Sequence, residues 1–132
     1  LENAILLAEQ LDYKIRIYDA YRTQDAQRKL WDFNPNPEFL SNPEKGSPHS
    51  RGVAIDLTLI DQKGNELDMG TEFDSFDEKS FHGSKKISKE SIVNRHKLLS
   101  IMTLSGFDFY INEWWHYQLY DSKKYPLLNI NP

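Results

Sequence analysis

The spacing of hydrophobic residues changes from helical to strand-like and back along the chain. Residues 1–11 carry apolar side chains three and four positions apart, which predicts an amphipathic helix. Residues 14–19 follow as a strand, and Thr23 is a suitable N-cap for a helix that runs through Trp31. The first quarter of the chain therefore predicts a helix, a strand and a second helix.

Residues 51–60 alternate between large apolar and small or polar side chains, which is the period of a β-strand. One face holds valine, isoleucine and leucine, and the other holds Ala54, Asp56 and Thr58. Such a small and polar face suits the floor of an active site. Residues 33–48 contain four of the six prolines, so we expect a loop before this strand.

The second half of the chain begins with a polar stretch. Residues 65–88 show little periodicity and predict a long loop, a kind of segment that is often functional. A helix then begins after Ser88 and ends before Gly106. Two aromatic strands over residues 107–112 and 115–120 follow. The whole pattern predicts an α+β fold, with a small central antiparallel sheet flanked by helices.

Composition narrows the class of protein. The 132 residues suit one compact domain spanning residues 1–132. Sixteen basic and 20 acidic residues give a net charge of −4, so we expect no nucleic-acid or membrane partner. The absence of cysteine leaves histidine and carboxylate as metal ligands. Without an apolar run of about 20 residues or a visible signal peptide, we expect a cytoplasmic protein with no obligate protein partner. Export to the periplasm or beyond stays open as the alternative, because a missing N-terminus would also remove a signal peptide.

Two distant segments supply the residues of a catalytic metal site. His49 and Asp56 lie in the first segment, and Glu113 and His116 lie in the second. Imidazole and carboxylate suit Zn²⁺, and three protein ligands leave a fourth position open for water. We therefore interpret His49, Asp56 and His116 as the ligands of one zinc ion. Glu113 remains as the general base that would activate water.

Each segment alone also fits a packed histidine beside a surface carboxylate. His49 and Asp56 are seven residues apart, which would place them on opposite faces of an unbroken strand. Either Gly52 allows the backbone to change direction, or His49 lies in the loop before the strand. Glu113 and His116 are three residues apart in a strand-forming stretch, so a metal site requires a turn or bulge between them.

The two segments belong to a wider pattern. The matching stretches, in order along the chain, are residues 18–22, 47–59, 69–74, 94–107 and 113–117, and they include Tyr21-Arg22 and Glu113-Trp114-Trp115-His116. With them the chain resembles the vancomycin-resistance-type D-alanyl-D-alanine dipeptidases, a branch of the zinc D,D-peptidase superfamily. The resemblance implies a fold similar to that of the Hedgehog signalling domain, with one zinc ion on the sheet. It also implies an N-terminal segment ahead of the stretch that matches Leu1.

The resemblance implies a role for each matching residue. His49, Asp56 and His116 would hold zinc, and Glu113 would be the catalytic base. Arg22 would stabilise the oxyanion, Asp74 would bind the free amino group of the substrate, and Ser47 would help to position it. The implied reaction is hydrolysis of the small dipeptide D-alanyl-D-alanine, a peptidoglycan precursor. Its purpose would be either glycopeptide-antibiotic resistance or recycling of D-alanine.

Two alternatives remain open. A D,D- or L,D-carboxypeptidase that acts on peptidoglycan peptides would use similar metal chemistry, although Asp74 argues for a substrate with a free amine. A noncatalytic zinc-binding module would keep the ligands, but it would need neither Glu113 as a base nor Arg22 as an oxyanion donor. Turnover of free and N-acylated dipeptides separates these alternatives.

Overall fold

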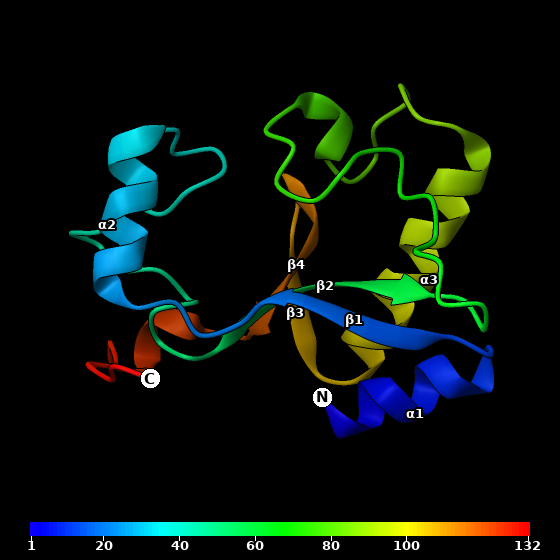
Figure 1. The fold of residues 1–132 in the computed structure, drawn as a ribbon, viewed down its shortest axis with the longest axis horizontal. Helices are drawn as coiled ribbons and strands as arrows, with labels where there is room; N and C mark the ends of the chain where they lie inside the picture. The colour runs from blue at the N-terminus through cyan, green and yellow to red at the C-terminus, as the bar shows by residue number, and fades with distance from the viewer.

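A four-stranded antiparallel sheet forms the centre of the computed structural model, which describes residues 1–132 (Figure 1). Its strands are β1 (Lys14–Asp19), β2 (Ala54–Ile60), β3 (Phe107–Tyr110) and β4 (Glu113–Leu119). Their order in the sheet is β1-β2-β4-β3, so the two strands that carry Asp56 and His116 are central neighbours. The predicted α+β class is confirmed.

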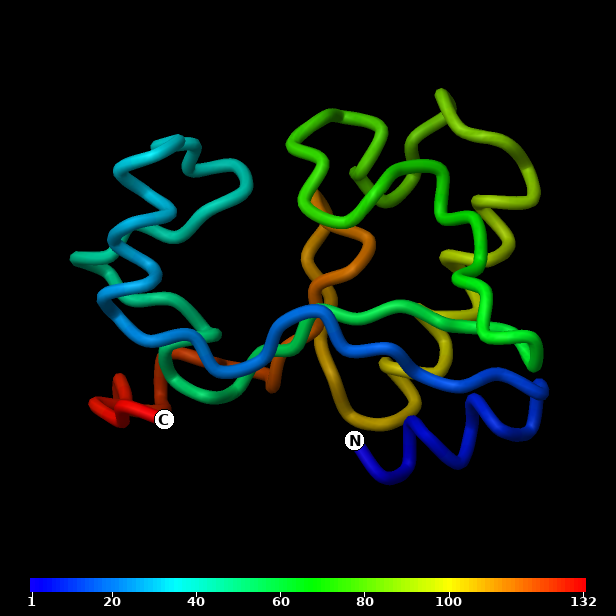
Figure 2. Tube along the Cα trace, viewed as in Figure 1, coloured from blue at the N-terminus to red at the C-terminus, as the bar shows by residue number.

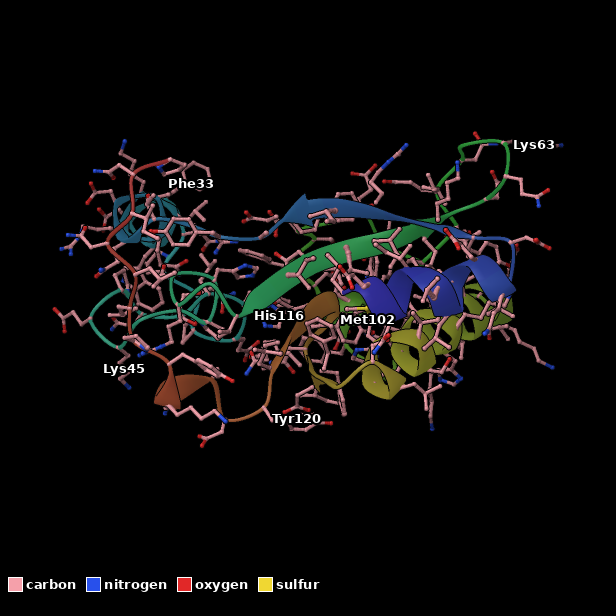
Figure 3. All side chains as sticks on the ribbon, turned by 90° about the horizontal axis from the view of Figure 1, so that it is seen from below. Phe33, Lys45, Lys63, Met102, His116 and Tyr120 are labelled. Carbon is pink, nitrogen blue, oxygen red and sulfur yellow. The ribbon has the colours of Figure 1, made fainter.

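Three helices surround this sheet unevenly. They are α1 (Glu2–Gln10), α2 (Gln24–Phe33) and α3 (Lys89–Leu104). Helices α1 and α3 lie together on one side of the strands, as Figure 3 shows. Helix α2 lies apart from α1 and α3. Figure 2 shows that the chain leaves β1, forms α2 and the loop after it, and then returns to pair with β1 as β2. None of the helices combines the length and apolar character of a membrane span.

The predicted helix starts are confirmed by their caps. The Thr23 hydroxyl accepts a hydrogen bond from the backbone N–H of Ala26, and the Ser88 hydroxyl accepts one from Ser91. Each cap satisfies a backbone donor that the first helical turn would otherwise leave unpaired. The Thr23 cap, immediately after Arg22, also fixes the start of α2 at Gln24.

The hydrophobic core joins the sheet to the pair α1 and α3, and its two tryptophans also contact Thr71 and Phe73 of the loop that follows β2. It contains small residues of α1, the apolar face of β2, one face of α3 and the aromatic residues of β4: Ala4, Ala8, Ile55, Leu57, Leu59, Leu98, Ile101, Met102, Trp114, Trp115 and Tyr117. The opposite face of β2 is also buried. Part of that cover comes from Phe73, which stacks on Tyr18 with ring centroids 4.4 Å apart. The predicted long loop therefore covers the polar face of the sheet.

Two strand boundaries differ from the sequence prediction. Strand β2 begins at Ala54 instead of residue 51, because Gly52 closes a turn with a φ of +70°. Strand β3 ends at Tyr110 and β4 begins at Glu113 instead of residue 115, so Glu113 lies in the same strand as His116. Two short 3-10 helices, η1 (Glu78–Ser80) and η2 (Ser122–Lys124), interrupt the loops.

Candidate functional site

One cavity of about 230 Å³ brings together all of the residues singled out from the sequence. They are Arg22, Ser47, His49, Asp56, Asp74, Glu113 and His116. Binding sites for drug-sized ligands usually enclose about 300–1,000 Å³. The cavity therefore suits a small ligand such as a dipeptide.

The atoms of His49, Asp56 and His116 have the spacing of a metal-ligand set. The Oδ1 atom of Asp56 lies 3.2 Å from Nε2 of His49 and 3.1 Å from Nδ1 of His116. All three side chains are buried, and their candidate ligand atoms lie within 4.8 Å of one another. Ligands held at about 2.1 Å by a tetrahedral ion would be roughly 3.4 Å apart. The three residues therefore fit a metal ion that retains an open coordination position.

The backbone explains how distant residues reach this arrangement. Asp56 and His116 are direct partners in the pairing of β2 with β4, so they share one face of the sheet. In β4, Glu113 pairs with Tyr110 and Tyr117 pairs with Phe109. Phe109 and Tyr110 are adjacent in β3, but three residues of β4 separate their partners. This extra length in β4 is the bulge predicted between Glu113 and His116.

His49 reaches the site from the turn before β2. Its backbone carbonyl accepts hydrogen bonds from Gly52 and Arg22, at 3.1 and 3.2 Å. The positive φ of Gly52 lets the chain leave this turn and enter the strand. Both explanations offered for the seven-residue spacing are therefore present, since His49 lies in a turn and Gly52 redirects the chain.

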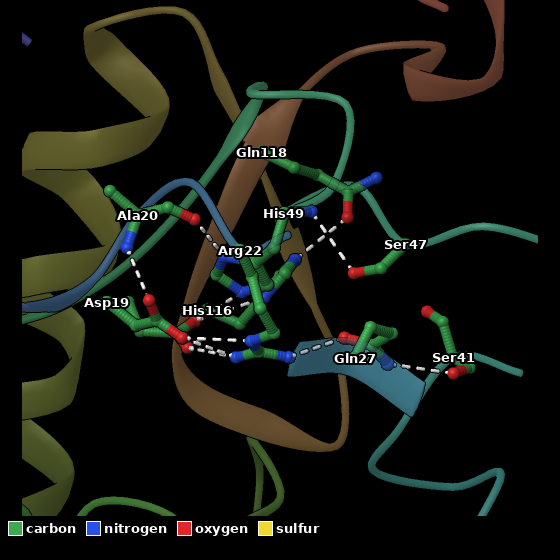
Figure 4. A network of polar contacts seen from close by, with 10 residues as sticks. Asp19, Ala20, Arg22, Gln27, Ser41, Ser47, His49, His116 and Gln118 are labelled. Atoms are coloured by element: carbon green, nitrogen blue, oxygen red, sulfur yellow. Dashed lines mark hydrogen bonds and ion pairs between the residues drawn. The ribbon is translucent and has the colours of Figure 1, made fainter. Parts of the chain in front are cut away.

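Hydrogen bonds determine which nitrogen of each histidine faces the metal position (Figure 4). Nδ1 of His49 lies 2.7 Å from the carbonyl oxygen of Ala20, and Nε2 of His116 lies 2.9 Å from Oε1 of Gln118. Both oxygens can only accept, so each of these nitrogens carries its proton. His49 is left with Nε2 and His116 with Nδ1 as free ligand atoms, and both atoms point to Asp56.

The two buried carboxylates have opposite electrostatic environments. Burial acts to raise the pKa of Asp56, but contacts with His116 and His49 outweigh it and lower the pKa to about 2. Burial raises the pKa of Glu113 to about 8, and the nearby His116 only partly opposes this rise. Asp56 is therefore anionic at neutral pH, as a metal ligand would have to be, whereas Glu113 readily holds a proton. A cation bound beside Glu113 would lower its pKa again.

Arg22 is held rigidly at the edge of the cavity (Figure 4). Its Nε and Nη2 atoms donate to Oδ2 of Asp19 at 3.0 and 2.6 Å, and its Nη1 atom donates to Oε1 of Gln27 at 2.8 Å. Nη2 also lies 3.8 Å from Oδ2 of Asp56. A bulge at Tyr18 in β1 sets this geometry, because it places Asp19 opposite Asp56. The guanidinium is thus fixed next to the candidate metal ligands before any substrate arrives.

Asp74 and Ser47 occupy two further parts of the cavity wall. Asp74 stands at the rim with a φ of +61°, and partial burial together with the charge of Asp56 raises its pKa. Ser47 is buried, and its hydroxyl accepts a hydrogen bond of 3.1 Å from the backbone N–H of His49. Ser47 therefore shapes the turn that presents His49 as well as lining the cavity.

Three residues of the site were missed by the reasoning from sequence. Asp19 and Gln27 hold Arg22, and Gln118 holds His116. Spacing could have indicated Gln118, because it is two residues from His116 and so lies on the same face of the strand. The contact between Asp19 and Arg22 required knowledge of the β1 bulge.

Comparison with known proteins agrees with this geometry. Residues 1–129 match a peptidase family model described as D-ala-D-ala dipeptidase. The chain is 44% identical over 128 residues to the D-alanyl-D-alanine dipeptidase of Escherichia coli (strain K12), covering 97% of this chain and 66% of that protein. It is 38% identical over 149 residues to the D-alanyl-D-alanine dipeptidase of Enterococcus faecium, covering 96% and 73% respectively. The chain therefore spans about two thirds of the length of the E. coli relative.

Proposed function

Because the chain belongs to the D-ala-D-ala dipeptidase family, we propose that it hydrolyses D-alanyl-D-alanine to two molecules of D-alanine with one zinc ion per chain. One observation carries this proposal. A three-ligand metal set, a buried carboxylate and a fixed guanidinium converge in a single cavity of about 230 Å³. A noncatalytic metal site would require only the first of these features.

His49, Asp56 and His116 would hold the zinc ion. Two neutral imidazoles and one carboxylate are a ligand set that zinc accepts, and the absence of cysteine removes the softer alternatives. When bound, zinc acidifies water and polarises a carbonyl group. The three protein ligands leave space beside Glu113 and Arg22, where the scissile peptide bond would lie.

Glu113 would move the proton of the reaction. It lines the same cavity as His116, and burial favours its protonated form once it has accepted a proton. As a general base, Glu113 takes a proton from the attacking water while the carbon–oxygen bond forms. It then donates that proton to the amine nitrogen as the carbon–nitrogen bond breaks, which returns Glu113 to its starting state.

Arg22 would stabilise the negative charge that develops on the peptide oxygen. Its contacts with Asp19 and Gln27 leave little freedom to reorganise when that charge appears. Donors that are fixed in advance favour the transition state over the ground state, which is the condition for a faster chemical step. Arg22 therefore acts on the reaction rate more than on ground-state binding.

Asp74 would make the site selective for a free dipeptide. Its carboxylate lines the same cavity as the metal-ligand set and carries no direct contact with it. A free ammonium group can form an ion pair with it, whereas an N-acylated chain has no charge there. Ser47, on the wall next to His49, would position the substrate backbone.

Reconstitution with metal tests this proposal directly. Metal-free protein should release no D-alanine from D-alanyl-D-alanine, and activity should rise with added zinc to a plateau at one equivalent per chain. His116→Ala protein serves as the matched control, because it should neither bind the equivalent nor gain activity. Zinc binding at one equivalent without D-alanine release would favour the noncatalytic module instead.

A further inference from the structure

Arg95 of α3 is buried and donates only to backbone carbonyl groups. Its Nε atom donates to Met69 at 2.7 Å, Nη2 to Lys79 at 2.6 Å and Nη1 to Phe81 at 3.0 Å. Only 3% of Arg95 is exposed. The planar guanidinium therefore joins one helix to both ends of the loop formed by residues 69–81, which we call the amine loop.

The environment of Arg95 is costly for a charged side chain. No carboxylate lies within ion-pair distance, and burial lowers the pKa of Arg95 to about 10 although the more distant charge of Asp68 acts in the opposite direction. A buried cation without an anionic partner is unfavourable unless its hydrogen bonds are satisfied. Here carbonyl oxygens satisfy them, so Arg95 is adapted to fix the backbone of the loop and not to form an ion pair.

The neighbouring residue reinforces this attachment. The Nδ2 atom of Asn94 donates to the carbonyl oxygen of Asp68 at 2.9 Å, one residue before the amine loop begins. Two consecutive residues of α3 therefore hold the start of the loop, and Arg95 also holds its end. In Figure 1 the chain after β2 rises beside the upper part of α3, and the green loop then extends above β4 before it returns to that helix.

The amine loop carries residues that border the cavity. Asp74 lies midway between the two anchored ends and lines the cavity. The rings of Phe76 and Phe81 pack against Phe39 of the opposite wall, with centroids 4.8 and 5.8 Å apart. Since Phe39 also lines the cavity, a shift of the loop would move Asp74 and loosen this wall together.

We propose that Arg95 is a positioning residue that places Asp74 for the substrate amine, and so sets both the affinity for the dipeptide and the preference for a free amino group. This inference rests on the proposed function and deepens it. Arg95 does not touch the cavity and acts through the loop. Its contribution should therefore appear in the recognition of the amine and not in the binding of the metal.

The test compares Arg95→Met and Arg95→Lys with the wild-type protein in steady-state kinetics. A shift of about 1 Å at a substrate-positioning group can reduce kcat/KM by up to about 100-fold, so we expect a fall of about 10- to 100-fold for D-alanyl-D-alanine. Most of the change should lie in KM, and the preference over N-acetyl-D-alanyl-D-alanine should decrease. Zinc affinity should not change, because the ligands lie on other elements.

Arg95→Lys separates hydrogen-bond geometry from charge. Lysine keeps the charge but cannot reach three carbonyl groups with one ammonium, so it should resemble Arg95→Met. Full recovery by lysine would overturn the inference. Lys97→Met is the matched control, because it removes a cation from the same helix that contacts Tyr13 and not the loop. Ile101→Ala controls for general loss of stability and should leave the free-amine preference intact.

Hydrogen exchange keeps this inference separate from the proposed function. The N–H groups of Asp77 and Ser80 are bonded within the loop, and their exchange should accelerate in Arg95→Met but not in Lys97→Met. If the wild type does not cleave the dipeptide, the proposed function fails, yet faster exchange still supports Arg95 as the loop anchor. If the wild type cleaves it and the variants keep both its preference and its exchange rates, only the inference fails.

Discussion

Replacement of Gln118 by leucine should weaken zinc binding about 10- to 100-fold, although Gln118 is not itself a ligand. Oε1 of Gln118 lies 2.9 Å from Nε2 of His116, and this contact keeps the proton on Nε2. Nδ1, at 3.1 Å from Asp56, is then free to bind metal. Leucine has a similar volume but no acceptor, so the substitution removes this control with little change in packing.

The magnitude follows from the burial of the ring. His116 is only 6% exposed, so without Gln118 its Nε2–H would lose its protein acceptor while the ring stays largely buried. An unsatisfied buried donor costs about 1–3 kcal/mol. At about 1.4 kcal/mol per factor of ten, this cost corresponds to a loss of roughly 5- to 150-fold in affinity. The expected range for the variant lies within these limits.

Competition with a chromophoric chelator measures the zinc affinity, and nitrogen NMR of the histidines reports the protonated ring nitrogen. Gln118→Glu should bind zinc at least as tightly as the wild type, because a carboxylate is the stronger acceptor. Ser122→Ala is the control, because it removes only the long 3.4 Å contact of Gln118 with Ser122. Unchanged affinity in Gln118→Leu, with the proton still on Nε2, would refute the reasoning.

Four further substitutions test other parts of the site. Metal analysis should find zinc in Glu113→Gln but not in His116→Ala, and the rate of D-alanine release by Glu113→Gln should fall by about 100-fold or more. Equal zinc loss in both variants would contradict the division into base and ligand. Arg22→Ala should lower kcat by about 100-fold or more in steady-state kinetics, and an effect confined to KM would assign Arg22 to binding. Gly52→Ala should lower the free energy of unfolding in denaturant titrations by about 1–2 kcal/mol, because the φ of Gly52 is +70° and an added Cβ would lie 2.8 Å from Leu128. Unchanged stability would argue against strain at this turn.

Local patterns were sufficient to predict most of the elements. The alternation over residues 51–60 identified β2, and Thr23 and Ser88 marked the starts of α2 and α3. Spacing also imposed a geometric condition, since Glu113 and His116 could share a site only with a bulge between them. The register of β3 with β4 contains that bulge.

Contacts between distant segments could not be predicted in the same way. Asp19 meets Arg22 beside Asp56 only because β1 is bulged at Tyr18, which no local pattern indicates. Arg95 donates to carbonyl groups 14 to 26 residues away. Every residue has a backbone carbonyl, so the residue types in the sequence do not show which ones accept these hydrogen bonds. Sequence thus indicates candidate reacting groups more readily than the groups that hold them.

The most direct test of the central claim is D-alanine release by the zinc-loaded protein from D-alanyl-D-alanine, measured beside N-acetyl-D-alanyl-D-alanine. Zinc held by His49, Asp56 and His116, with Asp74 at the substrate amine, predicts cleavage of the free dipeptide and little or no cleavage of the acetylated one. Equal cleavage of both would indicate a carboxypeptidase and remove Asp74 from its role. Cleavage of neither, with zinc bound, would contradict the assignment of this site as a dipeptidase active site.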